Sequence, residues 1–173
     1  MIRQKEKNRN IILIGMPGCG KTSFGRRLAE ALNRPFRDAD DVLVELEKRS
    51  IKDLFHESED AFRNAEIRTS RYLAGKSGLV IACGGGVVER EENIRLYRET
   101  GAIIFLDRSP EAIMSDVETE GRPLLKEGKQ RILDLYSRRI GKYRAAAEYT
   151  VENDGTEEQL MKKLLDLVKE EKL

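Results

Sequence analysis

The sequence holds few of the residues that build disulfide scaffolds or zinc sites, with two cysteines and one histidine among 173 residues. Cys19 and Cys83 are too few for a disulfide framework, so we interpret both as reduced thiols of an intracellular protein. A lone histidine without a cysteine cluster argues against zinc, and we expect His56 to lie at the surface. These absences leave the chemistry to other residue types.

An excess of one charge and a long apolar run are also missing. The net charge is +1 although 36% of the residues are charged, which offers no bulk field for nucleic acid or an acidic membrane. Apolar runs such as "GAIIFL" have the length of strands, not of membrane-spanning helices. The start, "MIRQKEKNRN", is basic but lacks the apolar stretch of a secretory signal. We therefore expect a cytoplasmic monomer that binds neither nucleic acid nor membranes.

What the sequence does contain is an alternation of strand-like and helix-like segments, without repeats or long linkers. The strand-like segments are "NIILIG", "RPFRDAD", "GLVIACGGG", "GAIIFLD" and "YTVEN". Helices are predicted at about 21–32, 58–73 and 130–147, and capping signals predict further helix starts at Ser50, Ser109 and Thr156. This pattern predicts an α/β fold with three layers, in which helices flank a five-stranded parallel sheet, and a single domain over residues 1–173.

The stretch "GMPGCGKT", residues 15–22, meets the pattern G-x-x-x-x-G-K-[ST] between a predicted strand and a predicted helix. The backbone N–H groups of such a loop, together with the helix N-terminus, can hold phosphate oxygens. Lys21 would reach the β- and γ-phosphates, and the Thr22 hydroxyl would ligate Mg²⁺. The alternative is a glycine-rich turn with a chance lysine. We predict that ATP is bound by Gly15, Pro17, Gly18, Cys19, Gly20, Lys21, Thr22 and Ser23.

Two further stretches end strands at one edge of the predicted sheet. In "DAD", Asp38 and Asp40 would lie on the same side of a strand end, because strand side chains alternate. One carboxylate could hold Mg²⁺ through water, and the other could accept a hydrogen bond from a substrate hydroxyl. The glycines 84–86 would offer free N–H groups at the edge where open parallel sheets bind ligands. The alternatives are a surface pair of aspartates and a tight turn.

Several arginines lie in distinctive surroundings. Arg63 and Glu66 are three residues apart on one predicted helical face, so the carboxylate can orient the guanidinium. Arg138 and Arg139 lie on a late helix, and two arginines that converge suggest a small anionic substrate. Arg122 lies in the polar, Gly- and Pro-interrupted stretch 117–129, which predicts a mobile lid.

In this order and along nearly the whole chain, these motifs resemble those of the shikimate kinase family. The family's set is a P-loop, a D-x-D strand end, an F-R-x-x-E helix, a triple glycine, an R-P-L-L lid and an R-x-x-x-Y helix. Here the motifs stand at residues 15–22, 38–40, 62–66, 84–86, 122–125 and 139–143. The resemblance implies a P-loop NTPase fold of the nucleoside monophosphate kinase type. It also implies transfer of the ATP γ-phosphoryl group to the 3-hydroxyl of shikimate, a step of chorismate and aromatic amino-acid biosynthesis.

The resemblance also implies a role for each matched residue. Asp40 would bind shikimate hydroxyls and accept a proton, and Arg63 and Arg139 would grip the shikimate carboxylate. Arg122 would contact ATP and neutralise charge on the transferred phosphoryl group. The implied catalytic residues are Lys21, Asp40 and Arg122, the implied metal ligands are Thr22 and Asp38, and the implied shikimate site is Asp40, Arg63, Gly84, Gly85, Gly86 and Arg139. The substrate-binding helices would lie at about 40–75.

The chain departs from the family pattern at three flanking places. Ser58-Glu59 stands where the family usually has Gly-Glu, and Gly141-Lys142 where it often has Pro-Leu. The stretch "MSDVETE" holds no arginine to stack on adenine. Two other functions stay open: a related small-metabolite kinase, such as a gluconate kinase, and a catalytically silent nucleotide-binding regulator. The regulator would be expected to lose Lys21, Asp40 or Arg122, and all three are present.

Overall fold

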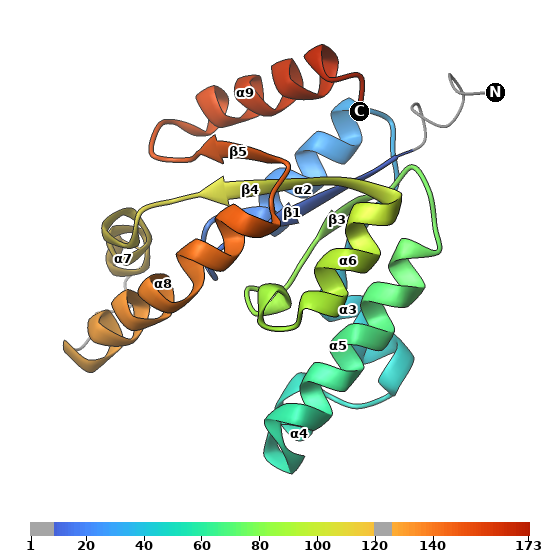
Figure 1. Cartoon of the computed structure of the whole chain (residues 1–173). Helices are drawn as coiled ribbons and strands as arrows, with labels where there is room; N and C mark the ends of the chain where they lie inside the picture. The colour runs from blue at the N-terminus through green and yellow to red at the C-terminus, as the bar shows by residue number, and fades with distance from the viewer. Residues whose placement is uncertain (1–8, 120–125) are drawn as a thin grey trace.

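The computed structural model describes residues 9–119 and 126–173, and its centre is a five-stranded sheet (Figure 1). The strand order is β2-β3-β1-β4-β5, and every neighbouring pair is parallel. The predicted α/β class and parallel sheet are therefore confirmed. The strands are β1 (Asn10–Ile14), β2 (Phe36–Asp38), β3 (Val80–Ala82), β4 (Gly101–Asp107) and β5 (Tyr149–Glu152).

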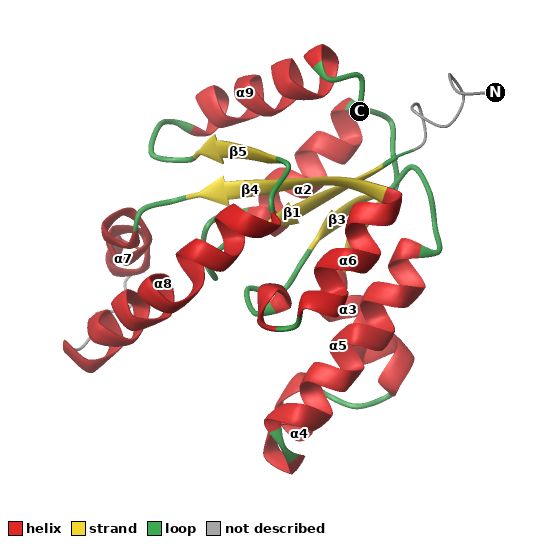
Figure 2. Cartoon of the chain, viewed as in Figure 1, coloured by secondary structure: helices red, strands yellow, loops and turns green. Residues whose placement is uncertain are grey.

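Helices cover both faces of the sheet and complete the three layers (Figures 1 and 2). Helices α2 (Lys21–Ala31) and α9 (Glu157–Glu170) contact each other on one face. The opposite face carries α5, α6 and α8. The crossover that contains α2 runs toward β2, whereas those that contain α5, α6 and α8 run toward β5. Right-handed crossovers that run in opposite directions place their helices on opposite faces of a sheet. The remaining helices are α3 (Ala39–Glu47), α4 (Ile51–Glu57), α5 (Glu59–Ala74), α6 (Glu91–Thr100), α7 (Pro110–Thr119), α8 (Lys126–Ala146) and the 3₁₀ helix η1 (Val87–Glu89).

Local sequence sets where several helices begin. The Ser50 hydroxyl accepts a hydrogen bond from a backbone N–H of the first turn of α4, and Ser109 does the same for α7. At the start of α9, Thr156 and Gln159 make both bonds of a capping box. These three predicted helix starts are confirmed, and Ser58 also caps α5.

Other expectations need correction. The second strand was predicted to include both aspartates, but β2 ends at Asp38 and α3 begins at Ala39, so Asp40 lies in the first turn of a helix. Helices α6 and η1 were not predicted, whereas α3 lies within the helical region expected at about 40–75. Helix α8 begins at Lys126, four residues before the predicted start. The centre of the predicted lid, residues 120–125 with Arg122, lies outside the described residues.

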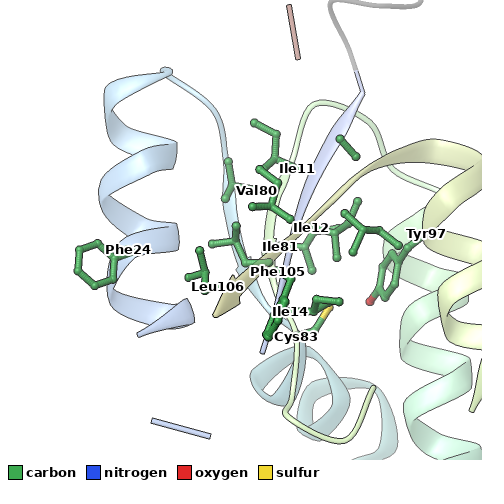
Figure 3. Packing of buried hydrophobic residues seen from close by; sticks show 14 of the residues in the cluster. Ile11, Ile12, Ile14, Phe24, Val80, Ile81, Cys83, Tyr97, Phe105 and Leu106 are labelled. Carbon is green, nitrogen blue, oxygen red and sulfur yellow. The ribbon is translucent and has the colours of Figure 1, made fainter. Parts of the chain in front are cut away.

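The main core lies between the sheet and its helices, and Figure 3 shows part of it. All five residues of β1 are buried, and so are residues 101–106 of β4. Apart from Asn10, β1 is apolar throughout, and such strands are typical of a parallel sheet that is covered on both faces. A second, smaller cluster under helices α3, α4 and α5 comprises Leu43, Leu54, Phe62 and Ala65. This second cluster fixes the helices that approach the carboxyl edge of the sheet.

Within the described ranges, no helix combines the length and the apolar character needed to cross a membrane. Cys19 and Cys83 are buried free thiols, and His56 is exposed, as expected. Burial raises the pKa of the Cys83 thiol, which keeps it protonated and unreactive.

Candidate active site

The candidate site lies at the carboxyl ends of β1 and β3, between which the crossover connections leave toward opposite edges of the sheet. From β1 the chain crosses to β2, and from β3 it crosses the other way to β4. Open α/β sheets bind ligands in the crevice at such a point. The two loops that meet there are the P-loop after β1 and the triple glycine after β3. The two loops are in close contact: a Cβ atom added to Gly85 would lie only 2.7 Å from Cδ of Pro17.

The P-loop has the backbone shape that its glycines permit. Gly18 and Gly20 have φ angles of +80° and +94°, which residues other than glycine rarely adopt. Gly20 is also the N-cap of α2, where no side chain accepts from the first N–H groups and no acidic residue lies in the first turn. The helix therefore presents free N–H groups and the positive end of its dipole to an anion.

Lys21 folds back over the loop that precedes it. Its Nζ atom donates to the carbonyl oxygens of Gly15 and Met16, at 2.8 and 2.9 Å, and the side chain is buried. An ammonium group has three donors, and the third makes a weak hydrogen bond to the Cys19 thiol. Cys19, whose Sγ lies 3.7 Å from Nζ, is buried beneath the loop, whereas Pro17, Gly18 and Ser23 are exposed.

Thr22 and Asp38 are side by side at the entrance to the site. The Thr22 hydroxyl donates to Oδ2 of Asp38 at 2.6 Å, and Oδ1 of Asp38 accepts from the backbone N–H of Asp40 at 3.0 Å. Hydroxyl and carboxylate oxygens are suitable ligands for Mg²⁺. Among the described residues, no cluster of three His, Cys, Asp or Glu could hold a metal ion. A cation at Thr22 and Asp38 would therefore need further oxygens from phosphate and water.

Asp40 faces the triple glycine from the first turn of α3. Its Oδ1 atom lies 2.9 Å from the position that a Cβ atom on Gly84 would occupy. Burial raises the pKa of Asp40, and the negative charge of Asp38 adds to this, while Lys21 opposes it. A carboxylate with a raised pKa is a better proton acceptor near neutral pH than an ordinary aspartate.

Arg63 and Glu66 form a buried ion pair on α5. Nη1 of Arg63 donates to Oε2 of Glu66 at 2.8 Å and to the carbonyl oxygen of Gly86 at 3.1 Å. The predicted contact between these residues is present, and it fixes the guanidinium against the triple glycine. Burial raises the pKa of Glu66, although the charge of Arg63 counteracts this effect.

Each of the three glycines lies against a different residue of the site, at a distance that leaves no space for a side chain. A Cβ atom on Gly86 would lie 2.6 Å from Nη2 of Arg63 and closer still to Nη1. Together with the contacts of Gly84 and Gly85, this means that Asp40, Pro17 and Arg63 occupy the space of the missing side chains. The triple glycine is therefore required for packing at the site and is more than a tight turn.

An aromatic pair lies beside Arg63. The rings of Phe55 and Phe62 stack with centroids 4.1 Å apart, and Cζ of Arg63 lies 5.0 Å from the centroid of Phe62. Phe55 is 45% exposed, so part of its ring is accessible beside Arg63. Sequence reasoning missed Phe55, because the break between α4 and α5 at Ser58 interrupts the helical spacing of the two rings.

Helix α8 reaches the site from the other side. The Tyr143 hydroxyl donates to the carbonyl oxygen of Gly85 at 2.6 Å, and the buried Arg139 donates from Nε to Oε1 of Glu89 at 2.7 Å. Arg138 is exposed. A cavity of about 380 Å³ lies nearby, and it is lined by Ser58, Glu59, Asp60, Arg63, Glu89 and Arg90.

The structure brings most of the predicted site residues together at one place. Those of the P-loop, the two aspartates, Arg63 and the glycines meet directly, and Arg139 joins them through Glu89, which sequence reasoning missed. Charges of Asp40, Arg63 and Arg139 all act on Glu66, which places them around one centre. The prediction for Arg122 falls outside the described residues.

Comparisons with known proteins agree with this geometry. The family model described as shikimate kinase matches residues 17–169. A shikimate kinase from Clostridium beijerinckii is 42% identical over 83% of this chain and 85% of its own. The solved structure of a shikimate kinase from Acinetobacter baumannii, in complex with shikimate, has a TM-score of 0.85 and 33% identity, over 99% of this chain and 98% of that one.

A gluconokinase from Sinorhizobium meliloti 1021 is also similar in structure, with a TM-score of 0.66 over 91% of this chain and 90% of that one. Its identity is 18%, so this likeness concerns the fold alone. The family match, by contrast, begins at Pro17 within the P-loop and extends over the triple glycine and α8. On this evidence the chain belongs to the shikimate kinase family.

Proposed function

We propose that the protein transfers the γ-phosphoryl group of ATP to the 3-hydroxyl of shikimate, giving shikimate 3-phosphate and ADP. The observation that carries this proposal is the junction at the triple glycine, where the P-loop, Asp40 and Arg63 pack against consecutive residues. A phosphate on the P-loop and an acceptor on Arg63 would thus be held next to each other. Holding both reactants in line is the larger part of catalysis in phosphoryl transfer.

On the acceptor side, each group of shikimate has a complementary residue. Arg63 and Arg139 would bind the carboxylate, since guanidinium groups match carboxylates in a planar fork. Asp40 would accept a hydrogen bond from the reacting hydroxyl and then its proton, which the raised pKa of Asp40 supports. Phe55 and Phe62 would form an apolar wall against the ring.

On the nucleotide side, Lys21 would give up its loop carbonyls and turn its donors to the β- and γ-phosphates. The backbone N–H groups at the start of α2 and those of Gly85 and Gly86 would donate to phosphate oxygens. We also propose that Arg122 neutralises charge on the transferred group, a role that rests on the R-P-L-L pattern alone.

Thr22 and Asp38 fit a magnesium ion, because their oxygens already meet at the end of the P-loop. Thr22 would bind it directly and Asp38 through water. When bound, Mg²⁺ supplies positive charge to the phosphate oxygens. All the residues with proposed roles come from one chain, and ATP is abundant in the cytoplasm, so we propose a cytoplasmic monomer.

The experiment that tests this function is an ADP-release assay with a panel of hydroxy acids. We expect saturable turnover with shikimate and little or none with gluconate, quinate or water. Turnover with gluconate at least as high as with shikimate would favour the other small-metabolite kinase. No turnover with any acceptor, despite ATP binding, would favour the silent regulator.

A further inference from the structure

We propose that Glu89 is a positioning residue of the acceptor site, which holds Arg139 so that its terminal NH₂ groups face the substrate carboxylate. This inference rests on the proposed function, which assigns Arg139 to that carboxylate. The motifs that identified the other site residues do not include Glu89. Its role follows from where η1 places it, three residues after the end of the triple glycine.

The carboxylate of Glu89 connects η1 to α8. Oε1 accepts from Nε of Arg139 at 2.7 Å, and Oε2 accepts from Nζ of Lys142 at 2.8 Å. A weaker contact joins Oε1 to Arg138 at 3.4 Å. Because the bond to Arg139 uses Nε, it orients the guanidinium plane without using the terminal NH₂ groups. These groups carry enough N–H donors to serve both the neighbouring Tyr143 side chain and a second carboxylate.

The surroundings keep Glu89 charged. Burial by itself would raise the pKa of Glu89, but the hydrogen bonds from Lys142 and Arg139 outweigh it and lower this pKa to about 2. One carboxylate among three cations leaves the cluster positive, as an anion site needs to be. The Glu89 side chain is only 14% exposed, and it lines the cavity of about 380 Å³ that Arg63 also lines.

A competing interpretation is that Glu89 occupies Arg139 in place of the substrate and weakens its binding. The two interpretations predict opposite changes in the KM for shikimate when Glu89 is removed: a rise if Glu89 positions Arg139, and a fall if it competes with the substrate. Three observations favour positioning: the contact uses Nε, each oxygen of Glu89 already has its own cation, and Arg139 is 7% exposed. A guanidinium this deeply buried needs a carboxylate to stay in place, because an unpaired buried charge is strongly unfavourable.

The first test is Glu89→Ala, with the initial rate measured against shikimate and against ATP. We expect the KM for shikimate to rise about tenfold, with the KM for ATP and kcat within about twofold. Glu89→Gln keeps an acceptor for Nε of Arg139 and should restore much of the loss. The matched control is Glu148→Ala, which removes a carboxylate that pairs with Arg9 at 2.9 Å beside the amino-terminal ends of β4 and β5 and should change neither KM.

The second test is a double-mutant cycle, in which the KM for shikimate is measured for Glu89→Ala, for Arg139→Ala and for the variant that carries both substitutions. If Glu89 acts through Arg139, the double variant should bind shikimate no more weakly than Arg139→Ala alone. A KM that falls or stays unchanged in Glu89→Ala, or losses that add in the double variant, would overturn the positioning role. If Arg139→Ala leaves the KM for shikimate unchanged, the proposed function of Arg139 fails instead, whatever Glu89 does.

Discussion

Adding one methyl group at Gly86 should test how the acceptor site is held together. Gly86 has φ −90° and ψ 5°, a backbone conformation that alanine also adopts, so Gly86→Ala introduces no strain of a left-handed residue. The obstacle is Arg63, whose Nη2 atom would lie 2.6 Å from the new Cβ atom. The substitution therefore displaces the guanidinium without touching its charge.

The size of the effect follows from this distance. Ordinary contact begins at 3.4 Å, so Nη2 must withdraw by about 0.8 Å and Nη1, which binds the Gly86 carbonyl at 3.1 Å, by more than that. The ion pair with Glu66 at 2.8 Å prevents an easy rotation. Losing a buried charged hydrogen bond costs about 2–5 kcal/mol. Since the displacement is partial, we expect about 2 kcal/mol, or about a thirtyfold rise in the KM for shikimate.

The assay is ADP release with shikimate and ATP varied independently. The KM for ATP should stay close to the wild-type value, because the P-loop contacts of Gly85 are unchanged. Gly141→Ala on α8 is the matched control: its Cβ atom would meet nothing within 4 Å, so both KM values should be unchanged. A wild-type KM for shikimate in Gly86→Ala, or a rise in the KM for ATP alone, would refute the assignment of Arg63.

Two further predictions concern charge in the site. Lys21→Met keeps most of the side-chain length and should lower kcat at least about a hundredfold, because one electrostatic stabiliser of the phosphates is lost; near-normal turnover would contradict the P-loop assignment. Asp40→Asn should lower turnover strongly but raise the melting temperature at pH 8. The raised pKa of Asp40 means that its contribution to stability is present below the unfolded pKa and is lost as the pH rises through the folded pKa. Thermal unfolding against pH checks this, and the difference between variant and wild type should vanish near pH 3.

The features that sequence predicted well are those set by neighbouring residues. The caps at Ser50, Ser109 and Thr156 depend on bonds within three residues, and the P-loop depends on glycines and a lysine at fixed spacing. The sheet followed from the alternation of apolar runs with helical segments. Each of these signals is complete within a short stretch of chain, so no knowledge of the fold is needed to detect it.

The segment around Asp40 was misjudged because two interpretations compete there. The stretch "RPFRDAD" was assigned as a whole to a strand, yet Asp38 caps a helix by accepting from the N–H of Asp40. Asp40 still lies beside Gly84, because the first turn of α3 and the end of β2 are at the same edge of the sheet. Glu89 could not be predicted at all, since its partners Arg139 and Lys142 are fifty or more residues away.

Within the described part of the chain, the three cations that would bind ligands are paired inside the protein before any ligand arrives. Lys21 is bound to loop carbonyls, Arg63 to Glu66, and Arg139 to Glu89. Burying these charges without partners would cost several kcal/mol each, so the pairing is what allows a dry, shaped site to exist in the free protein. Ligand binding then differs between the three. Lys21 must exchange its carbonyls for phosphates, whereas the two arginines can keep their carboxylates and use their remaining donors. We therefore expect the nucleotide side of the site to rearrange on binding, and the acceptor side to be largely preformed.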